Sequence, residues 1–79
     1  MLNYPVRLIP GEEGLVLVVF PDLPEAVSCG EGEDEAIARA GDVLDIILAS
    51  YRAEGRPIPR PSDIEGTPTV SSERFGRSN

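Results

Sequence analysis

One stretch of six apolar residues, LVLVVF at residues 15–20, constrains this chain more than any other feature. The side chains of a β-strand alternate between its two faces, so each face of this stretch carries three apolar side chains. A half-buried strand would instead alternate apolar and polar residues. PDLP at residues 21–24 then ends the strand, because proline cannot donate a ladder hydrogen bond and Asp22 favours a turn. Both faces of this strand therefore need cover.

The flanking residues predict two more strands and one long helix. Residues Leu2–Ile9 are predicted as a strand, and the polar segment PGEEG (10–14) is typical of a hairpin connection to the apolar stretch. Residues Ala26–Cys29 predict a short third strand. Between Asp34 and Glu54, apolar residues recur at spacings of three and four, which indicates an amphipathic helix. Gly55 follows at the position where glycine commonly ends a helix.

Gly41 interrupts the helical pattern at a cost of about 1 kcal/mol relative to alanine, so we expect close packing of the helix against the sheet there. After the helix, TPTVSS (67–72) is a candidate fourth strand, and the last residues predict a flexible polar tail. Residues 1–62 are thus assigned to one domain, and 63–79 to a short candidate strand and the tail. The fold class is α+β: a three-stranded antiparallel sheet with one long helix on one face, in the order β-β-β-α-β.

A single helix can cover only one face of such a sheet. The other face needs the C-terminal segment, another copy of the chain or a different protein. A chain of 79 residues buries only about 60% of its unfolded surface, so support from outside the chain is expected. Exposed apolar sheet faces normally mark interaction surfaces. We therefore expect a protein partner and a homo-oligomer, a dimer or larger.

The charge is negative and unevenly distributed. The chain has 14 acidic and 7 basic residues, and residues 12–45 hold ten of the acids but one base, Arg39. Nucleic-acid binders carry a basic face, so direct nucleic-acid binding is not expected. The acidic segment suits a basic protein partner, because opposite fields steer the encounter. On charge alone, a solvated acidic surface that keeps the protein soluble is the simpler interpretation.

The composition excludes most catalytic chemistry. Without histidine there is no Ser–His or Cys–His pair and no His-ligated zinc, and without lysine there is no Schiff base. The remaining alternative is a carboxylate-held magnesium site, with Asp22, Glu31, Asp34, Asp42 and Asp45 as its candidates. They form no fixed ligand pattern, and solvated carboxylates are the preferred interpretation. We expect no enzyme and no cofactor or metal.

Cysteine usage and the N-terminal residues indicate the compartment. A single cysteine, Cys29, excludes an internal disulfide. The first residues lack the basic and long apolar regions of a signal peptide, and the longest apolar run is too short to cross a bilayer. These features predict a cytoplasmic protein without membrane contact.

Several short motifs, in this order and spacing, resemble the HicB antitoxin family over Tyr4–Ser62. They are Tyr4-Pro5, the turn that ends at Gly14, FPDLP (20–24), Gly30, Glu35-Ala36 and GRPIP (55–59). The resemblance implies a partial RNase H-like fold without nuclease activity. It also implies a function: binding and inhibiting HicA, a small basic toxin that cleaves messenger RNA with a catalytic histidine. Family members often add a C-terminal domain that binds their own promoter. Because only 24 residues follow Gly55, we expect a short form without that domain.

The partner-binding candidates come from two acidic segments. They are Asp22, Leu23 and Glu25 at the turn, and Glu33, Asp34 and Glu35 at the helix start. For Leu23, packing in the core is the preferred interpretation. For the helix acids, compensation of the helix dipole competes with a binding role. The alternative to an antitoxin is an orphan homo-oligomeric interaction or regulatory module with no toxin partner.

Overall fold

Two small antiparallel sheets and one long helix make up the fold. The computed structural model describes residues 2–72, and the predicted polar tail from residue 73 lies outside them. In chain order the elements are β1 (Asn3–Pro5), β2 (Arg7–Pro10), the 3-10 turn η1 (Glu12–Gly14), β3 (Leu15–Phe20), β4 (Leu23–Glu31), α1 (Glu33–Ala53) and β5 (Thr69–Ser71).

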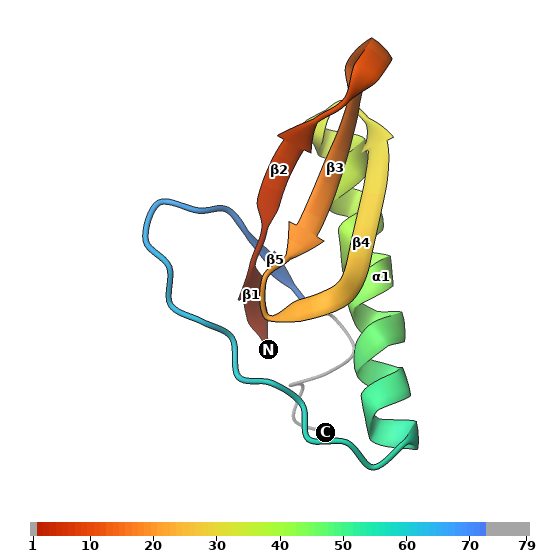
Figure 1. Ribbon diagram of the computed structural model, residues 1–79, viewed down its shortest axis with the longest axis vertical. Helices are drawn as coiled ribbons and strands as arrows, with labels where there is room; N and C mark the ends of the chain where they lie inside the picture. The colour runs from red at the N-terminus through yellow and green to blue at the C-terminus, as the bar shows by residue number, and fades with distance from the viewer. Residues whose placement is uncertain (1, 73–79) are drawn as a thin grey trace.

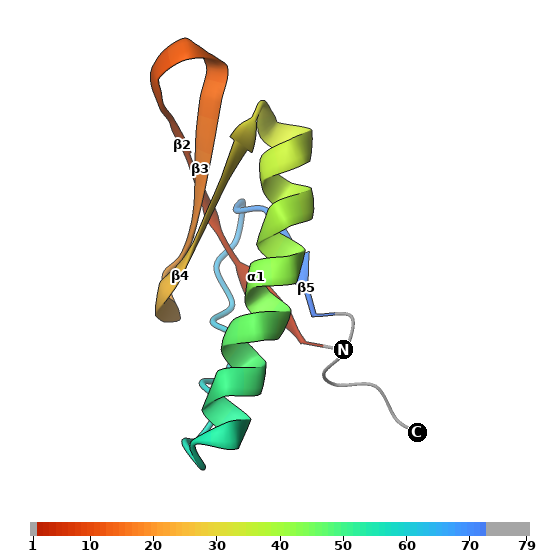
Figure 2. The same ribbon diagram turned by 90° about the vertical axis from the view of Figure 1, so that its right-hand side faces the viewer.

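The larger sheet has three antiparallel strands in the order β2-β3-β4, so the apolar strand β3 lies at its centre. Helix α1 covers one face of this sheet and leaves the other open (Figures 1 and 2). The predicted fold, a three-stranded antiparallel sheet with one long helix on one face and a further C-terminal strand, is confirmed.

The first predicted strand is interrupted, and this interruption gives the fourth strand its partner. The chain breaks at Val6 into β1 and β2, and the Val6 amide donates to the Pro68 carbonyl oxygen at 3.0 Å. β5 pairs antiparallel with β1 alone, with Tyr4 opposite Val70. The C-terminal strand therefore forms a separate two-stranded ladder, and Val70 contributes to the core.

β4 is longer than the predicted third strand because it begins directly after the turn, at Leu23. Its pairing with β3 shifts between Val19 and Phe20: Val19 lies opposite Val27, whereas Phe20 lies opposite Leu23. The intervening residues form an irregularity on an edge strand. Proline is tolerated at such places because its nitrogen is not required to donate a ladder hydrogen bond, and Pro24 can therefore lie within β4.

Small residues bring α1 close to β4. At Gly30, an added Cβ would lie 2.6 Å from the amide nitrogen of Ala36, so the first turn of the helix rests directly on the strand. The buried Ser28 hydroxyl donates to the Ala36 carbonyl oxygen at 3.0 Å. The prediction that Gly41 allows close packing against the sheet was wrong, since apart from the neighbouring backbone of α1 itself no described atom lies within 4 Å of a Cβ built there.

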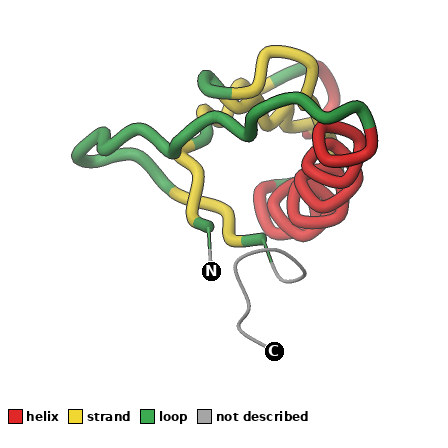
Figure 3. The backbone as a smooth tube through the Cα atoms, turned by 90° about the horizontal axis from the view of Figure 1, so that it is seen from below, coloured by secondary structure: helices red, strands yellow, loops and turns green. Residues whose placement is uncertain are grey.

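The core lies between α1, the three-stranded sheet and the β1–β5 ladder. Its buried members are Tyr4, Val6, Val18, Phe20, Leu23, Ala26, Ala36, Ala40, Leu44, Leu48, Tyr51 and Val70. A wide loop joins the C-terminal end of α1 to β5 (Figures 1 and 3). The loop is held to the core where the Tyr4 hydroxyl donates to the Pro59 carbonyl oxygen at 2.6 Å.

Candidate partner-binding surfaces

The first candidate surface is the sheet face that α1 leaves uncovered, here called the open face. Alternation along β3 directs Val18 and Phe20 to the helix, where both are buried, and exposes the alternate residues. The register places Ile9 and Cys29 on either side of Leu17. The apolar members of the open face are Ile9, Leu15, Leu17, Val19, Val27 and Cys29.

The open face remains accessible throughout the described part of the chain. Leu17, at its centre, is 38% exposed and Val27 is 49% exposed. The loop after α1 and strand β5 therefore do not provide the cover that the apolar strand requires. Three candidates were considered to cover this face: the C-terminal segment, another copy of the chain and a different protein. The C-terminal segment up to residue 72 does not cover it.

The second candidate surface, here called the acidic end, forms where the β2–β3 turn meets the start of α1. The Gly32 amide donates to the Gly14 carbonyl oxygen at 3.0 Å, which joins the two segments. The acidic end comprises six exposed carboxylates: Glu12, Glu13, Glu31, Glu33, Asp34 and Glu35. Carboxylates near a helix N-terminus also complement the helix dipole.

Within the acidic end, one basic side chain compensates part of the charge. The Arg39 guanidinium lies 3.2 Å from a Glu35 carboxylate oxygen, one turn earlier on the helix. The same Glu35 oxygen accepts from the Glu31 amide at 3.3 Å. Glu12, Glu13 and Glu31 were not among the predicted partner-binding residues. Two features of the sequence could have located them at the acidic end. The turn between β2 and β3 is short, and the end of β4 lies directly before the start of the helix.

The predicted residues at the turn lie at the opposite end of β4 from the acidic end (Figure 1). Asp22 holds the loop: its carboxylate accepts from the Ser62 amide at 2.8 Å and from the Ser62 hydroxyl at 2.6 Å. Leu23 is completely buried, so it contributes to the core and presents no surface. The six predicted residues are therefore divided between two places.

Glu25 takes part in a small cluster at the C-terminal end of α1. The Tyr51 hydroxyl donates to a Glu25 carboxylate oxygen at 2.8 Å, and the Arg56 guanidinium lies 4.0 Å from the centre of the Tyr51 ring. The hydrogen bond to Glu25 is the main cause that raises the pKa of Tyr51 above its usual 10.0. Burial is the main cause that raises the pKa of Tyr4. Glu25 thus has an internal role, which fastens the helix end to β4.

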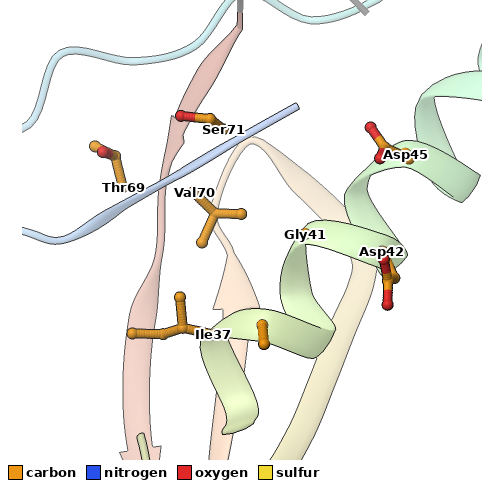
Figure 4. A pocket seen from close by; sticks show the side chains of 8 residues that line it. Ile37, Gly41, Asp42, Asp45, Thr69, Val70 and Ser71 are labelled. Atoms are coloured by element: carbon orange, nitrogen blue, oxygen red, sulfur yellow. The ribbon is translucent and has the colours of Figure 1, made fainter. Parts of the chain in front are cut away.

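A shallow groove lies between α1 and β5, away from both surfaces. Figure 4 shows Ile37 and Gly41 on the helix and Val70 on the strand lining it, with Asp42 and Asp45 along the helix. The Ser72 hydroxyl donates to Asp45 at 2.9 Å, which ties β5 to the helix. Gly41 opens onto this groove, which explains the space around it.

The described residues offer no arrangement for metal chemistry. Across residues 2–72, no three Asp, Glu, Cys or His side chains are grouped so that they could hold a metal ion. The five acids considered for a magnesium site are distributed over the turn, the helix start and the groove. No helix in that range is both long and apolar enough to span a membrane.

Comparison with protein families and known proteins places these surfaces in context. The family model described as the HicB-like antitoxin of bacterial toxin–antitoxin systems matches residues 3–70. Antitoxin HicB 1 of Photorhabdus laumondii is 40% identical over 63 residues, which cover 80% of this chain and 41% of that protein. Antitoxin HicB of Escherichia coli K12 is 40% identical over 63 residues, covering 80% of this chain and 46% of that protein. The chain thus spans less than half the length of these relatives.

The fold has a solved counterpart. The crystal structure of the N-terminal domain of Burkholderia pseudomallei antitoxin HicB superposes with a TM-score of 0.76, at 18% identity, over 91% of this chain and 99% of that one. This match supports the fold alone. The family model covers most of the chain and the resemblance in sequence agrees with it: the chain belongs to the HicB-like antitoxin family.

Proposed function

We propose that this chain is an antitoxin that neutralises a small basic HicA-like toxin, an enzyme that cleaves messenger RNA, by direct contact in the cytoplasm. The observation that carries the proposal is membership of the HicB-like antitoxin family, since the match extends over residues 3–70. The chemistry of the chain agrees with it, because a protein without histidine or lysine and with a net charge of −7 is suited to binding a basic enzyme.

The acidic end is the surface that we assign to the toxin. A ribonuclease binds the phosphate backbone of its substrate with basic residues. A cluster of carboxylates can bind the same basic residues in place of the phosphates. Six exposed carboxylates and the single nearby base Arg39 make this end strongly negative. The predicted residues Glu33, Asp34 and Glu35 belong to it, whereas Asp22 and Glu25 already have partners within the chain.

The charge of this surface sets the rate of encounter more than the lifetime of the complex. Opposite fields raise association rates well above the range for uncharged partners, and salt screens them with a Debye length of about 8 Å at physiological ionic strength. We therefore expect the association rate to fall steeply as salt is added, while the dissociation rate changes little.

The proposal is tested by searching beside the gene for this chain for a small basic reading frame with a histidine, and by co-expressing its product with this chain. Co-expression should relieve its toxicity, and the two proteins should co-purify at low salt. Failure to co-purify at low salt would reject the antitoxin role for that pair. The orphan module, the alternative without a toxin, would then be favoured.

Paired charge variants separate the contact surface from general electrostatics. Glu33→Gln with Asp34→Asn removes two charges from the acidic end, and Asp63→Asn with Glu65→Gln removes two exposed charges from the loop after α1. We expect the first pair to lower the association rate roughly tenfold and the second pair to change it far less. Equal effects of the two pairs would contradict the assigned surface but leave the antitoxin role standing.

A further inference from the structure

We infer that the groove between α1 and β5 is a docking site for residues 73–79 of this chain, which fold back along β5 (Figure 4). This inference concerns a surface separate from the open face and the acidic end, and it does not depend on the antitoxin role. The groove has a volume of about 430 Å³, within the range of pockets that bind ligands. The occupant is identified from the backbone of β5, from the charge of the groove and from the position of Ser72.

One edge of β5 has no strand beside it within residues 2–72. β5 pairs with β1 alone, and in this ladder the Ser72 amide donates to the Leu2 carbonyl oxygen at 2.8 Å. Bonded and non-bonded pairs alternate in an antiparallel ladder, so the backbone groups of Thr69 and Ser71 point away from β1. Both residues line the groove. The free edge is therefore a template on which a further strand can form beside the groove.

The charge of the groove favours a basic occupant. The carboxylates of Asp42 and Asp45 line its helix side, whereas the residues of β5 that line it are uncharged. Residues 73–79 contain two arginines, Arg74 and Arg77, and one acid, Glu73. The segment is thus basic in a chain that is acidic as a whole, and opposite charges favour its contact with the groove.

The position of Ser72 favours this segment over a basic segment of another protein. Ser72 is buried, and its hydroxyl donates to Asp45 at 2.9 Å, so residue 73 follows at the rim of the groove. A short connection gives a segment of the same chain an effective concentration on the order of millimolar, which a separate protein does not reach at ordinary cellular levels. A hairpin loop takes about two to five residues, so residues 73–79 are long enough to turn and to pair with β5.

The side chains of the segment match the groove. In an extended strand, alternate side chains point to the same side, which places Phe75 and Arg77 together. With that side toward α1, Phe75 would fill the apolar part of the groove and Arg77 would reach Asp42.

The test is amide hydrogen exchange of the full chain, followed by NMR. Pairing with residues 73–79 should protect the Ser71 amide, and Arg77→Glu should speed its exchange at least roughly tenfold. Arg60→Glu is the matched control, because it makes the same charge change on the exposed loop after α1 and should leave this exchange unchanged. Asp42→Arg should act as Arg77→Glu does, and the two changes together should restore protection.

A chain truncated after Ser72 provides a second measurement. Its Ser71 amide should lose protection, while the Val6 amide, which is bonded to Pro68 beside the β1–β5 ladder, should keep its exchange rate and show that the ladder is intact. A Ser71 amide that exchanges equally fast with and without residues 73–79 would overturn the inference, as would equal effects of Arg77→Glu and Arg60→Glu.

Two further outcomes would assign the groove to another occupant. Protection of the Ser71 amide that rises with protein concentration would mean that a second copy covers the edge of β5. Protection that arises only when a toxin is added would assign the groove to the toxin. In both cases the inference fails while the antitoxin function stands.

Discussion

Replacing Gly30 by alanine is the sharpest test of how the helix rests on the sheet. The added Cβ would lie 2.6 Å from the Ala36 nitrogen and 2.9 Å from the Ala36 Cα. Both are backbone atoms, which cannot rotate away as a side chain can. To restore ordinary contact at 3.4 Å, the strand and the helix start must move apart by several tenths of an ångström.

The cost of this movement has two parts. Overpacking of a well-packed contact costs about 1–3 kcal/mol. The same movement stretches the 3.0 Å hydrogen bond from Ser28 to Ala36, and a buried hydroxyl without a partner costs about 1–3 kcal/mol. We expect a total loss of about 3 kcal/mol, out of a stability on the order of 4–12 kcal/mol for a domain of this size.

Thermal unfolding followed by circular dichroism measures the effect. A loss of about 3 kcal/mol should lower Tm by roughly 10–20 °C in a domain of this length. Gly41→Ala is the matched control: a Cβ there meets open space, so the gain in helix propensity should raise stability by about 1 kcal/mol. Equal protein concentrations are needed throughout, because self-association makes Tm depend on concentration. A Gly30→Ala protein with the same Tm as the wild type would refute the described contact.

Two further predictions concern the contacts at the other end of β4. Folding raises the pKa of Tyr51 above 10.0, so the stability that its hydroxyl contributes is present below pH 10.0 and is lost as pH rises through the folded-state pKa. In urea unfolding, the free energy of unfolding of Tyr51→Phe should therefore fall less at alkaline pH than that of the wild type. An equal fall in both proteins would contradict the contact with Glu25. Asp22→Ala removes both bonds to Ser62 and should cost about 1 kcal/mol and speed hydrogen exchange of the Ser62 amide, whereas Asp63→Ala should leave that exchange unchanged.

Much of the fold could be predicted because its elements depend on local pattern. The apolar stretch at residues 15–20 is the strand β3 with the predicted bounds, and the predicted helix differs from α1 by one residue at each end. Strand β4 was predicted too short at its start, because a proline usually argues against a strand. Pro24 is tolerated in β4 only because it lies at an irregularity in the pairing on an edge strand. The candidate site was predicted only as separate acidic segments, since chain order does not show which segments meet.

Local sequence pattern is sufficient to specify a strand that is apolar on both faces and a single amphipathic helix, because alternation and helical periodicity are properties of neighbouring residues. Tertiary structure alone decided which face the helix covers and that the loop leaves the other face open. It also joined Asp22 to Ser62 and brought the β2–β3 turn against the start of α1. These contacts link residues far apart in the chain, and their formation depends on how the whole chain packs.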